Sequence, residues 1–166
     1  MDNLTSSSKE DIIKNISYHT KKARDSFVQS ESLNYIDGNC HENAIRLSSY
    51  LYYDTPYEPY IRWGVVDYHD EENLNLQQAE HDGKVHFWVE IPIENDDWVY
   101  ADIFSMSSIS ENLTRGEIFV NTKLPETYKQ LDKTLFKYRP EIKPRHILCY
   151  DDYFLLQDMF NVEFID

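Results

Sequence analysis

Three residues of the 166-residue chain, Cys40, His86 and Asp102, have the types and the order of a thiol catalytic triad. A cysteine thiolate can attack an acyl carbon, a histidine can take and return a proton, and a carboxylate can hold the imidazole in one orientation. These roles require that the three side chains meet. The elements around each residue therefore decide whether the chemistry is available.

Cys40 lies where the sequence predicts the start of a helix. Asn39 can cap this helix, and Glu42, three residues later, completes a capping-box pattern. The apolar residues that follow at helical spacing are Ala44, Leu47 and Leu51. Unpaired amides and the positive end of the helix dipole favour a thiolate at the first helical residue. The alternative, which local sequence alone favours, is that Cys40 is a small buried hydrophobic residue.

The other two residues fall in a predicted β-hairpin, because residues 85–91 and 98–104 both alternate between apolar and polar side chains across a short polar connection. A connection centred on Glu94 would place His86 opposite Asp102. The other opposed pairs would be Trp88 with Tyr100 and Glu90 with Trp98. Directly opposed Cβ atoms lie about 5 Å apart. The carboxylate could therefore accept the imidazole N–H and leave the second ring nitrogen for a thiol.

A cysteine at a helix start, a His-x-Trp-x-Glu strand and a Trp-to-Asp strand together resemble the transglutaminase-like branch of the papain-like thiol enzymes. The resemblance covers roughly residues 38–104. It implies that Cys40 is the nucleophile, His86 the general base and Asp102 the residue that orients the base. Relatives include peptidases, amidases, deamidases, cross-linkers and members that have lost catalysis. The resemblance therefore implies a type of reaction more closely than a substrate.

The candidates for binding the substrate or stabilising an oxyanion lie close to the triad in sequence. They are Tyr35, Asn34, Asn39 and Trp88. The Cys40 amide is a further candidate donor to the oxyanion. Trp88 and Trp98 could shield the His–Asp pair from water, although ordinary packing in the hairpin would explain both residues equally well.

The charge of the chain limits its partners. Thirty acidic and sixteen basic residues give a formal net charge of -14, which opposes binding to nucleic acids or to an anionic membrane surface. The acidic residues are dispersed, which favours a solvated, halophile-like surface over a dedicated site for a cationic substrate. No run of apolar residues is long enough for a membrane helix, and no signal pattern opens the sequence, so we expect a cytoplasmic protein.

The cysteines and histidines predict neither a structural disulfide nor a metal site. If Cys40 is a nucleophile, the second cysteine, Cys149, is left unpaired, as expected in a reducing compartment. The histidines lack the paired spacing of structural zinc ligands. His41 points about 100° away from Cys40 on a helix, so we expect it at the surface or behind the site. We expect no cofactor.

The remaining segments complete an α+β fold in which helices pack on an antiparallel sheet. We expect helices over residues 8–29, 40–53 and 125–136, and further strands over residues 60–68 and 145–150. Gly64, inside the first of these strands, permits either a close backbone approach or a bulge. The resemblance implies a transglutaminase-like or papain-like core within a single domain, residues 1–166.

The expected function is that of a thiol hydrolase or acyltransferase acting on an amide bond of a peptide or small amide. Cysteine peptidases, amidases and transglutaminase-like enzymes all fit this description. The alternative is a catalytically inactive transglutaminase-like protein that serves as a binding module or scaffold. The sequence leaves open the natural substrate, the choice between water and an amine as acceptor, and the oligomeric state.

Overall fold

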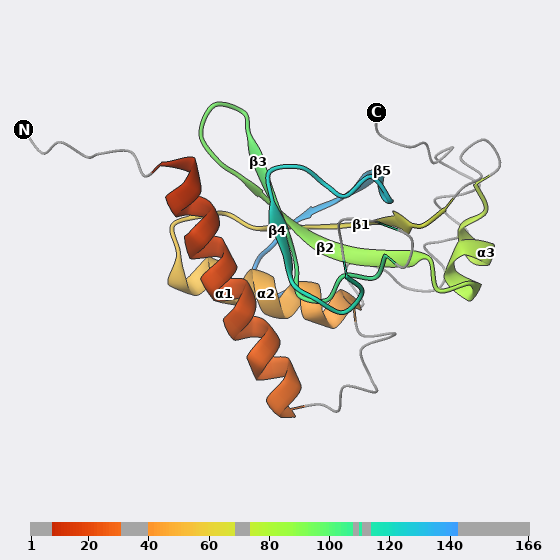
Figure 1. Cartoon of the computed structure of the whole chain (residues 1–166), viewed down its shortest axis with the longest axis horizontal. Coiled ribbons are helices and arrows are strands. Elements are labelled where there is room, and N and C mark those ends of the chain that lie inside the picture. Colours follow the sequence, from red (N-terminus) through yellow and green to blue (C-terminus); the bar gives the residue numbers. More distant parts are fainter. Residues whose placement is uncertain (1–7, 31–39, 69–73, 108–109, 111–113, 143–166) are drawn as a thin grey trace, which may run out of the picture.

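The computed structural model describes residues 8–30, 40–68, 74–107, 110 and 114–142 (Figure 1). The helices are α1 (Lys9–Ser30), α2 (Cys40–Asp54) and α3 (Leu76–His81), and the strands are β1 (Tyr60–Val66), β2 (Val85–Pro92), β3 (Trp98–Asp102), β4 (Phe119–Asn121) and β5 (Tyr128–Lys137). The strands form one antiparallel sheet in the order β4-β3-β2-β1-β5. The α+β class expected from the sequence is confirmed.

Helices α1 and α2 pack together on one face of the sheet (Figure 1). Each helix presents a stripe of apolar residues at helical spacing, as the sequence predicts. The buried residues of these stripes are Ile12, Ile16, Ala23 and Phe27 of α1 and Ala44, Leu47 and Leu51 of α2. They pack against Phe87, Val89 and Ile91 of β2. Alternate residues His86, Trp88 and Glu90 therefore lie on the opposite face of the sheet, yet they are also buried.

The ends of the first two helices match their sequence signals. Ser8 caps α1, because its hydroxyl accepts a hydrogen bond from the amide of Asp11 at 3.2 Å. Cys40 is the first residue of α2. Next to this cap, Lys9 pairs with Asp97 in the β2–β3 connection at 3.0 Å. This exposed pair contributes little energy but joins the start of α1 to the hairpin.

The hairpin exists, but its predicted register is wrong by two residues. Val89 pairs with Ala101 and Glu90 with Tyr100, so Trp88 does not face Tyr100 and Glu90 does not face Trp98. The turn residues account for the difference. Asn95 and Asp96 have φ angles of 62° and 60°, a conformation that Asn and Asp tolerate, and they centre the connection one residue later than Glu94. A shift of two residues keeps every side chain on its predicted face.

The helix predicted over residues 125–136 is wrong, because most of this segment belongs to strand β5, Tyr128–Lys137. Arg62 of β1 pairs with Leu135 and Gly64 pairs with Gln130, so β5 has extra residues between these two pairs. This bulge interrupts the two-residue alternation expected of a strand. The buried residues of β5, among them Tyr128, Leu131 and Thr134, consequently follow a spacing close to that of a helix. The strand predicted over residues 145–150 lies outside the described residues.

Gly64 serves both purposes that the sequence allowed, since it lies at this bulge and its backbone meets close neighbours. A Cβ atom on Gly64 would lie 2.1 Å from the Lys129 carbonyl oxygen and 2.7 Å from a ring carbon of Trp88. Both distances are far inside van der Waals contact. The glycine thus allows β5 and the Trp88 indole to approach β1.

Replacing Gly64 with alanine should destabilise the fold by about 3 kcal/mol, because a backbone atom must move to admit the methyl group. Gly83→Ala is the matched control. Gly83 has a φ angle of 68° but open space around it, so its replacement should cost only about 1 kcal/mol. Urea unfolding of both variants measures the difference. Equal losses would mean that the contacts around Gly64 relax freely.

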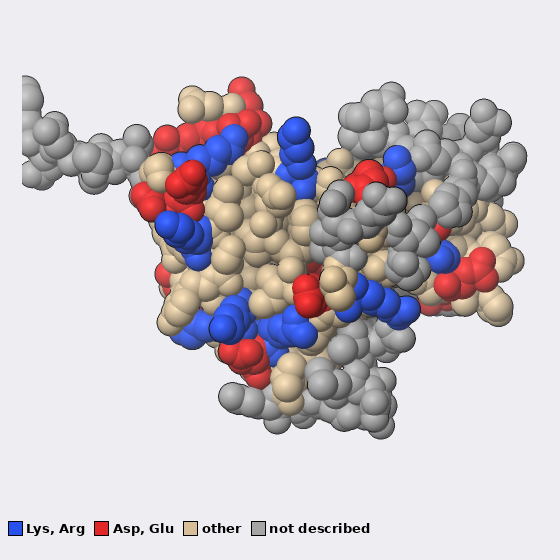
Figure 2. Space-filling view, in the orientation of Figure 1, with Lys and Arg blue, Asp and Glu red and all other residues tan. Residues whose placement is uncertain are grey.

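Acidic and basic side chains are interspersed over the face seen in Figure 2, in agreement with the dispersed charges of the sequence. Because the net charge is -14, repulsion among surface carboxylates should destabilise the fold at low salt. Such repulsion acts over about 10 Å at 0.1 M salt and about 3 Å at 1 M. We expect the melting temperature to rise with sodium chloride over this range. A flat or falling melting temperature would contradict a halophile-like surface.

Within the described part of the chain, no helix has the length and apolar character needed to cross a membrane.

Candidate active site

His86, the second residue of β2, and Asp102, the last residue of β3, meet at one end of the hairpin. The Nε2 atom of His86 lies 2.7 Å from Oδ2 of Asp102, and both side chains are buried. Because the register is shifted by two residues, His86 does not lie directly opposite Asp102 as predicted. It contacts Asp102 diagonally across the two strands. Diagonal neighbours on one face are within reach of long side chains.

Asp102 is held by three hydrogen-bond donors. Besides His86, the Tyr128 hydroxyl donates to Oδ2 at 2.7 Å, and the Phe104 amide donates to Oδ1 at 3.2 Å. Donors on both oxygens fix the orientation of this buried carboxylate. Tyr128 was not predicted as a site residue, because the sequence pattern around it favoured a helix.

Cys40 lies half-buried at the first position of α2, where its thiol interacts with two imidazoles. Burial alone would raise the pKa of the thiol, but hydrogen bonding to His41 and His86 and their positive charges outweigh burial and lower its pKa to about 6. At neutral pH Cys40 is therefore largely a thiolate, which is the reactive form.

The His86 ring interacts with both the Cys40 thiol and the Asp102 carboxylate. Burial alone would lower its pKa, but the charge and the hydrogen bond of Asp102, followed by those of Cys40, raise its pKa to about 10. Asp102 occupies Nε2, whereas Nδ1 is buried and has no hydrogen-bond partner of normal geometry among the described residues. The interaction of Cys40 with this ring is thus a loose one, as is common in active sites without substrate.

His41 takes a larger part than its sequence position predicted. It is half-buried, and its ring centroid lies 5.9 Å from that of Phe87 in β2. Hydrogen bonding to Cys40 raises the pKa of His41 against the opposing effect of burial. The expectation of a place behind the site therefore understates its contact with the thiol. A cationic His41 would stabilise the thiolate without taking part in proton transfer.

Trp88 covers the His–Asp pair from the same face of the sheet. Its ring centroid lies 6.2 Å from that of His86 and 5.2 Å from that of Tyr128. Its indole N–H donates to Glu90 Oε1 at 3.1 Å. Trp88 thus packs against its neighbours and also covers the His–Asp pair. Trp98 instead packs against Tyr60 at the far end of the hairpin, with ring centroids 5.8 Å apart.

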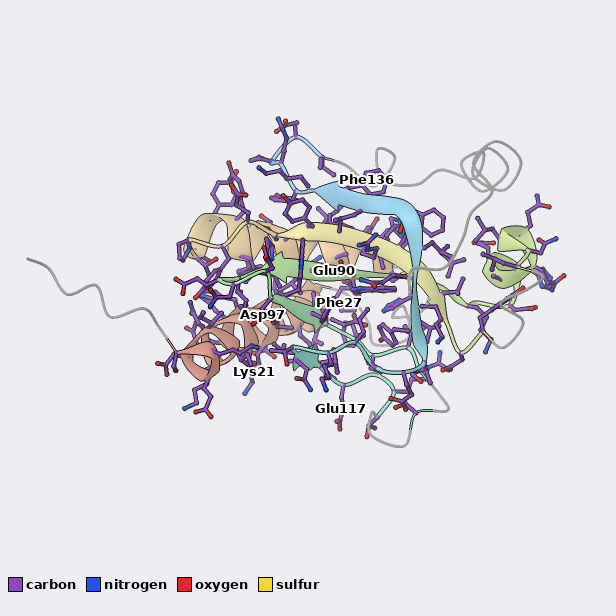
Figure 3. The ribbon with its side chains drawn as sticks, turned by 90° about the horizontal axis from the view of Figure 1, so that it is seen from above. Lys21, Phe27, Glu90, Asp97, Glu117 and Phe136 are labelled. Atoms are coloured by element: carbon purple, nitrogen blue, oxygen red, sulfur yellow. The ribbon has the colours of Figure 1, made fainter. Side chains whose placement is uncertain are left out.

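Glu90, near the middle of the sheet in Figure 3, anchors this indole within a buried polar cluster. The Arg62 guanidinium donates to both carboxylate oxygens at 3.2 Å, and Gln130 donates to Oε1. Because Glu90 is both paired and fully hydrogen-bonded, its burial is tolerated. The cluster fixes the position of Trp88 relative to His86.

The proposed oxyanion and substrate residues Tyr35, Asn34 and Asn39 lie outside the described residues, as does Cys149. Among the residues with described side chains, no group of three or more His, Cys, Asp or Glu is arranged to hold a metal ion.

Comparisons of the chain with protein-family models, with curated proteins and with solved structures found no match.

Proposed function

We propose that this protein is a thiol hydrolase or acyltransferase that acts on an amide bond. The observation that carries the proposal is the buried 2.7 Å contact between His86 and Asp102, next to a cysteine thiol at the first position of a helix. The arrangement supports a transglutaminase-like or papain-like core, in which Cys40 is the nucleophile, His86 the base and Asp102 the orienting residue.

In the proposed reaction the Cys40 sulfur attacks the carbonyl carbon and forms a tetrahedral intermediate. The His86 imidazolium then gives its proton to the leaving amine, and the C–N bond breaks to leave a thioester on Cys40. Neutral His86 next takes a proton from water or from an acceptor amine, which attacks the thioester and releases Cys40. Asp102 stabilises the imidazolium in each cycle.

The lowered pKa of Cys40 and the raised pKa of His86 favour this reaction over an inert buried cysteine. With pKa values of about 6 and about 10, the thiolate–imidazolium pair is the main form between these pH values. An inactive scaffold gains nothing from a buried charged pair, which costs desolvation energy. The scaffold alternative is accordingly weaker, although it shares the same fold.

Unbiased substrate profiling tests the proposal. Wild-type protein and Cys40→Ala would each be incubated with a peptide library, with and without a primary amine, and the products identified by mass spectrometry. We expect cleaved, deamidated or amine-linked products from wild type only. Identical products from both proteins would favour the scaffold alternative. Amine-linked products would assign acyl transfer, and their absence beside hydrolysed products would assign hydrolysis.

A further inference from the structure

Tyr128 lies at the start of β5, at the opposite edge of the sheet from β3 and β4, yet its hydroxyl reaches Asp102 of β3. Its ring packs on Val66 of β1 and Trp88 of β2, the two strands that lie between β5 and β3. The close approach of β5 and Trp88 to Gly64 permits this path. A phenylalanine would fill the same apolar space, so packing alone does not require the hydroxyl group.

One hydrogen bond of this hydroxyl has a fixed direction. The Met106 amide can only donate, and it does so to the Tyr128 oxygen at 3.2 Å. The hydroxyl proton is therefore free to point at Asp102 Oδ2. A carboxylate oxygen can accept this hydrogen bond. Burial and the charge of Asp102 raise the pKa of Tyr128, so the phenol keeps its proton.

The same carboxylate oxygen accepts from both Tyr128 and His86, each at 2.7 Å. The tyrosine ring also stands edge-on to the imidazole, at 5.7 Å between centroids and 88° between planes. Tyr128 thus contacts both members of the His–Asp pair. We propose that Tyr128 is a positioning residue, whose hydroxyl clamps Asp102 and whose ring confines His86.

This inference rests on the proposed function for its catalytic meaning, but the clamp itself acts on proton binding. Among the described residues, the titratable groups that act on His86 are Cys40 of α2 and Asp102 of β3, and the Tyr128 ring of β5 packs against it. Removing the Tyr128 hydroxyl leaves His86 as the remaining described donor to Asp102 Oδ2, while the Phe104 amide still donates to Oδ1. The imidazolium is then held more tightly, and the pKa of His86 rises.

The test uses NMR of protein labelled with ¹³C at histidine Cε1, in a Cys40→Ala background. Removing Cys40 should lower the pKa of His86, because the thiol is one of the groups that raise this pKa. The chain has six histidines, and the signal missing in His86→Gln identifies the one to follow. Tyr128→Phe should move the midpoint of His86 upward by about one pH unit. Tyr100→Phe is the control, because Tyr100 lies on the same face of β3 as Asp102. This change should leave the midpoint of His86 unchanged.

With Cys40 present, Tyr128→Phe should lower kcat on an activated ester about tenfold with little change in KM, while Tyr100→Phe should lower neither. An unmoved His86 midpoint in folded Tyr128→Phe would overturn the clamp, whether or not the protein is an enzyme. A shifted midpoint with no turnover by wild type would instead retain the clamp and reject the proposed function. If Tyr128→Phe does not fold, the exchange rate of the Tyr128 hydroxyl proton with water is measured in the unmodified protein instead. Protection from exchange would support the clamp, and rapid exchange with water would overturn it.

Discussion

Cys40→Ala and His86→Ala should each abolish turnover of an activated ester or amide. The first change removes the attacking sulfur, and the second removes the base and the proton that the leaving amine requires. Loss of one member of a complete triad lowers kcat by a factor on the order of 10⁶. Stopped-flow or endpoint assays with a chromogenic leaving group measure the loss, with circular dichroism as the test of folding.

Because Cys40 and His86 act as one unit, the double variant should be scarcely less active than either single variant. Losses that multiply would show two independent contributions and would contradict a shared mechanism. His19→Gln is a suitable control, since His19 is a buried histidine of α1 whose charged neighbours are Asp54 and Lys22. Its replacement should leave kcat and KM near their wild-type values.

Asp102→Asn should lower kcat by roughly 10³ to 10⁴ and leave a measurable residue of activity. Asparagine keeps the size of the side chain and can still accept from Tyr128, but it cannot stabilise an imidazolium. Since Asp102 is the main cause of the raised pKa of His86, the alkaline limb of the pH–rate profile should move down from about pH 10. The profile of kcat against pH measures both effects.

An alkaline limb that stays in place in a folded Asp102→Asn variant would show that Asp102 does not set the protonation of His86. Glu90→Gln provides a comparison, because Glu90 is a buried carboxylate on the same face that contacts Trp88 instead of His86. We expect this variant to lose stability through the unpaired Arg62 while its alkaline limb stays near that of wild type.

The face on which His86 and Asp102 meet could be predicted from the sequence, because strand alternation survives the error in register. The turn at Asn95 and Asp96 moved the pairing by two residues, and two residues is one full period of a strand. The start of α2 at Cys40 was equally predictable, since capping and apolar spacing are local signals.

Tyr128 could not be found in the same way. The bulge in β5 gives its buried residues a helix-like spacing, and the contact with Asp102 depends on the path of a strand from the opposite edge of the sheet. Contacts of this kind are set by tertiary packing, which a local pattern does not record. The hydrogen bond of His41 to the thiol was not predicted either, because it depends on side-chain positions that a local pattern does not record.

The most direct test of the central claim is the rate of Cys40 alkylation by iodoacetamide as a function of pH, followed by peptide mass spectrometry so that Cys40 and Cys149 are measured separately. In wild type, the Cys40 rate should rise with a midpoint near pH 6. In His86→Ala the midpoint should move toward the ordinary thiol value of about 8.5, because the imidazolium is gone. A wild-type midpoint already near 8.5, or one that His86→Ala leaves unchanged in a folded protein, would contradict a thiolate activated by His86.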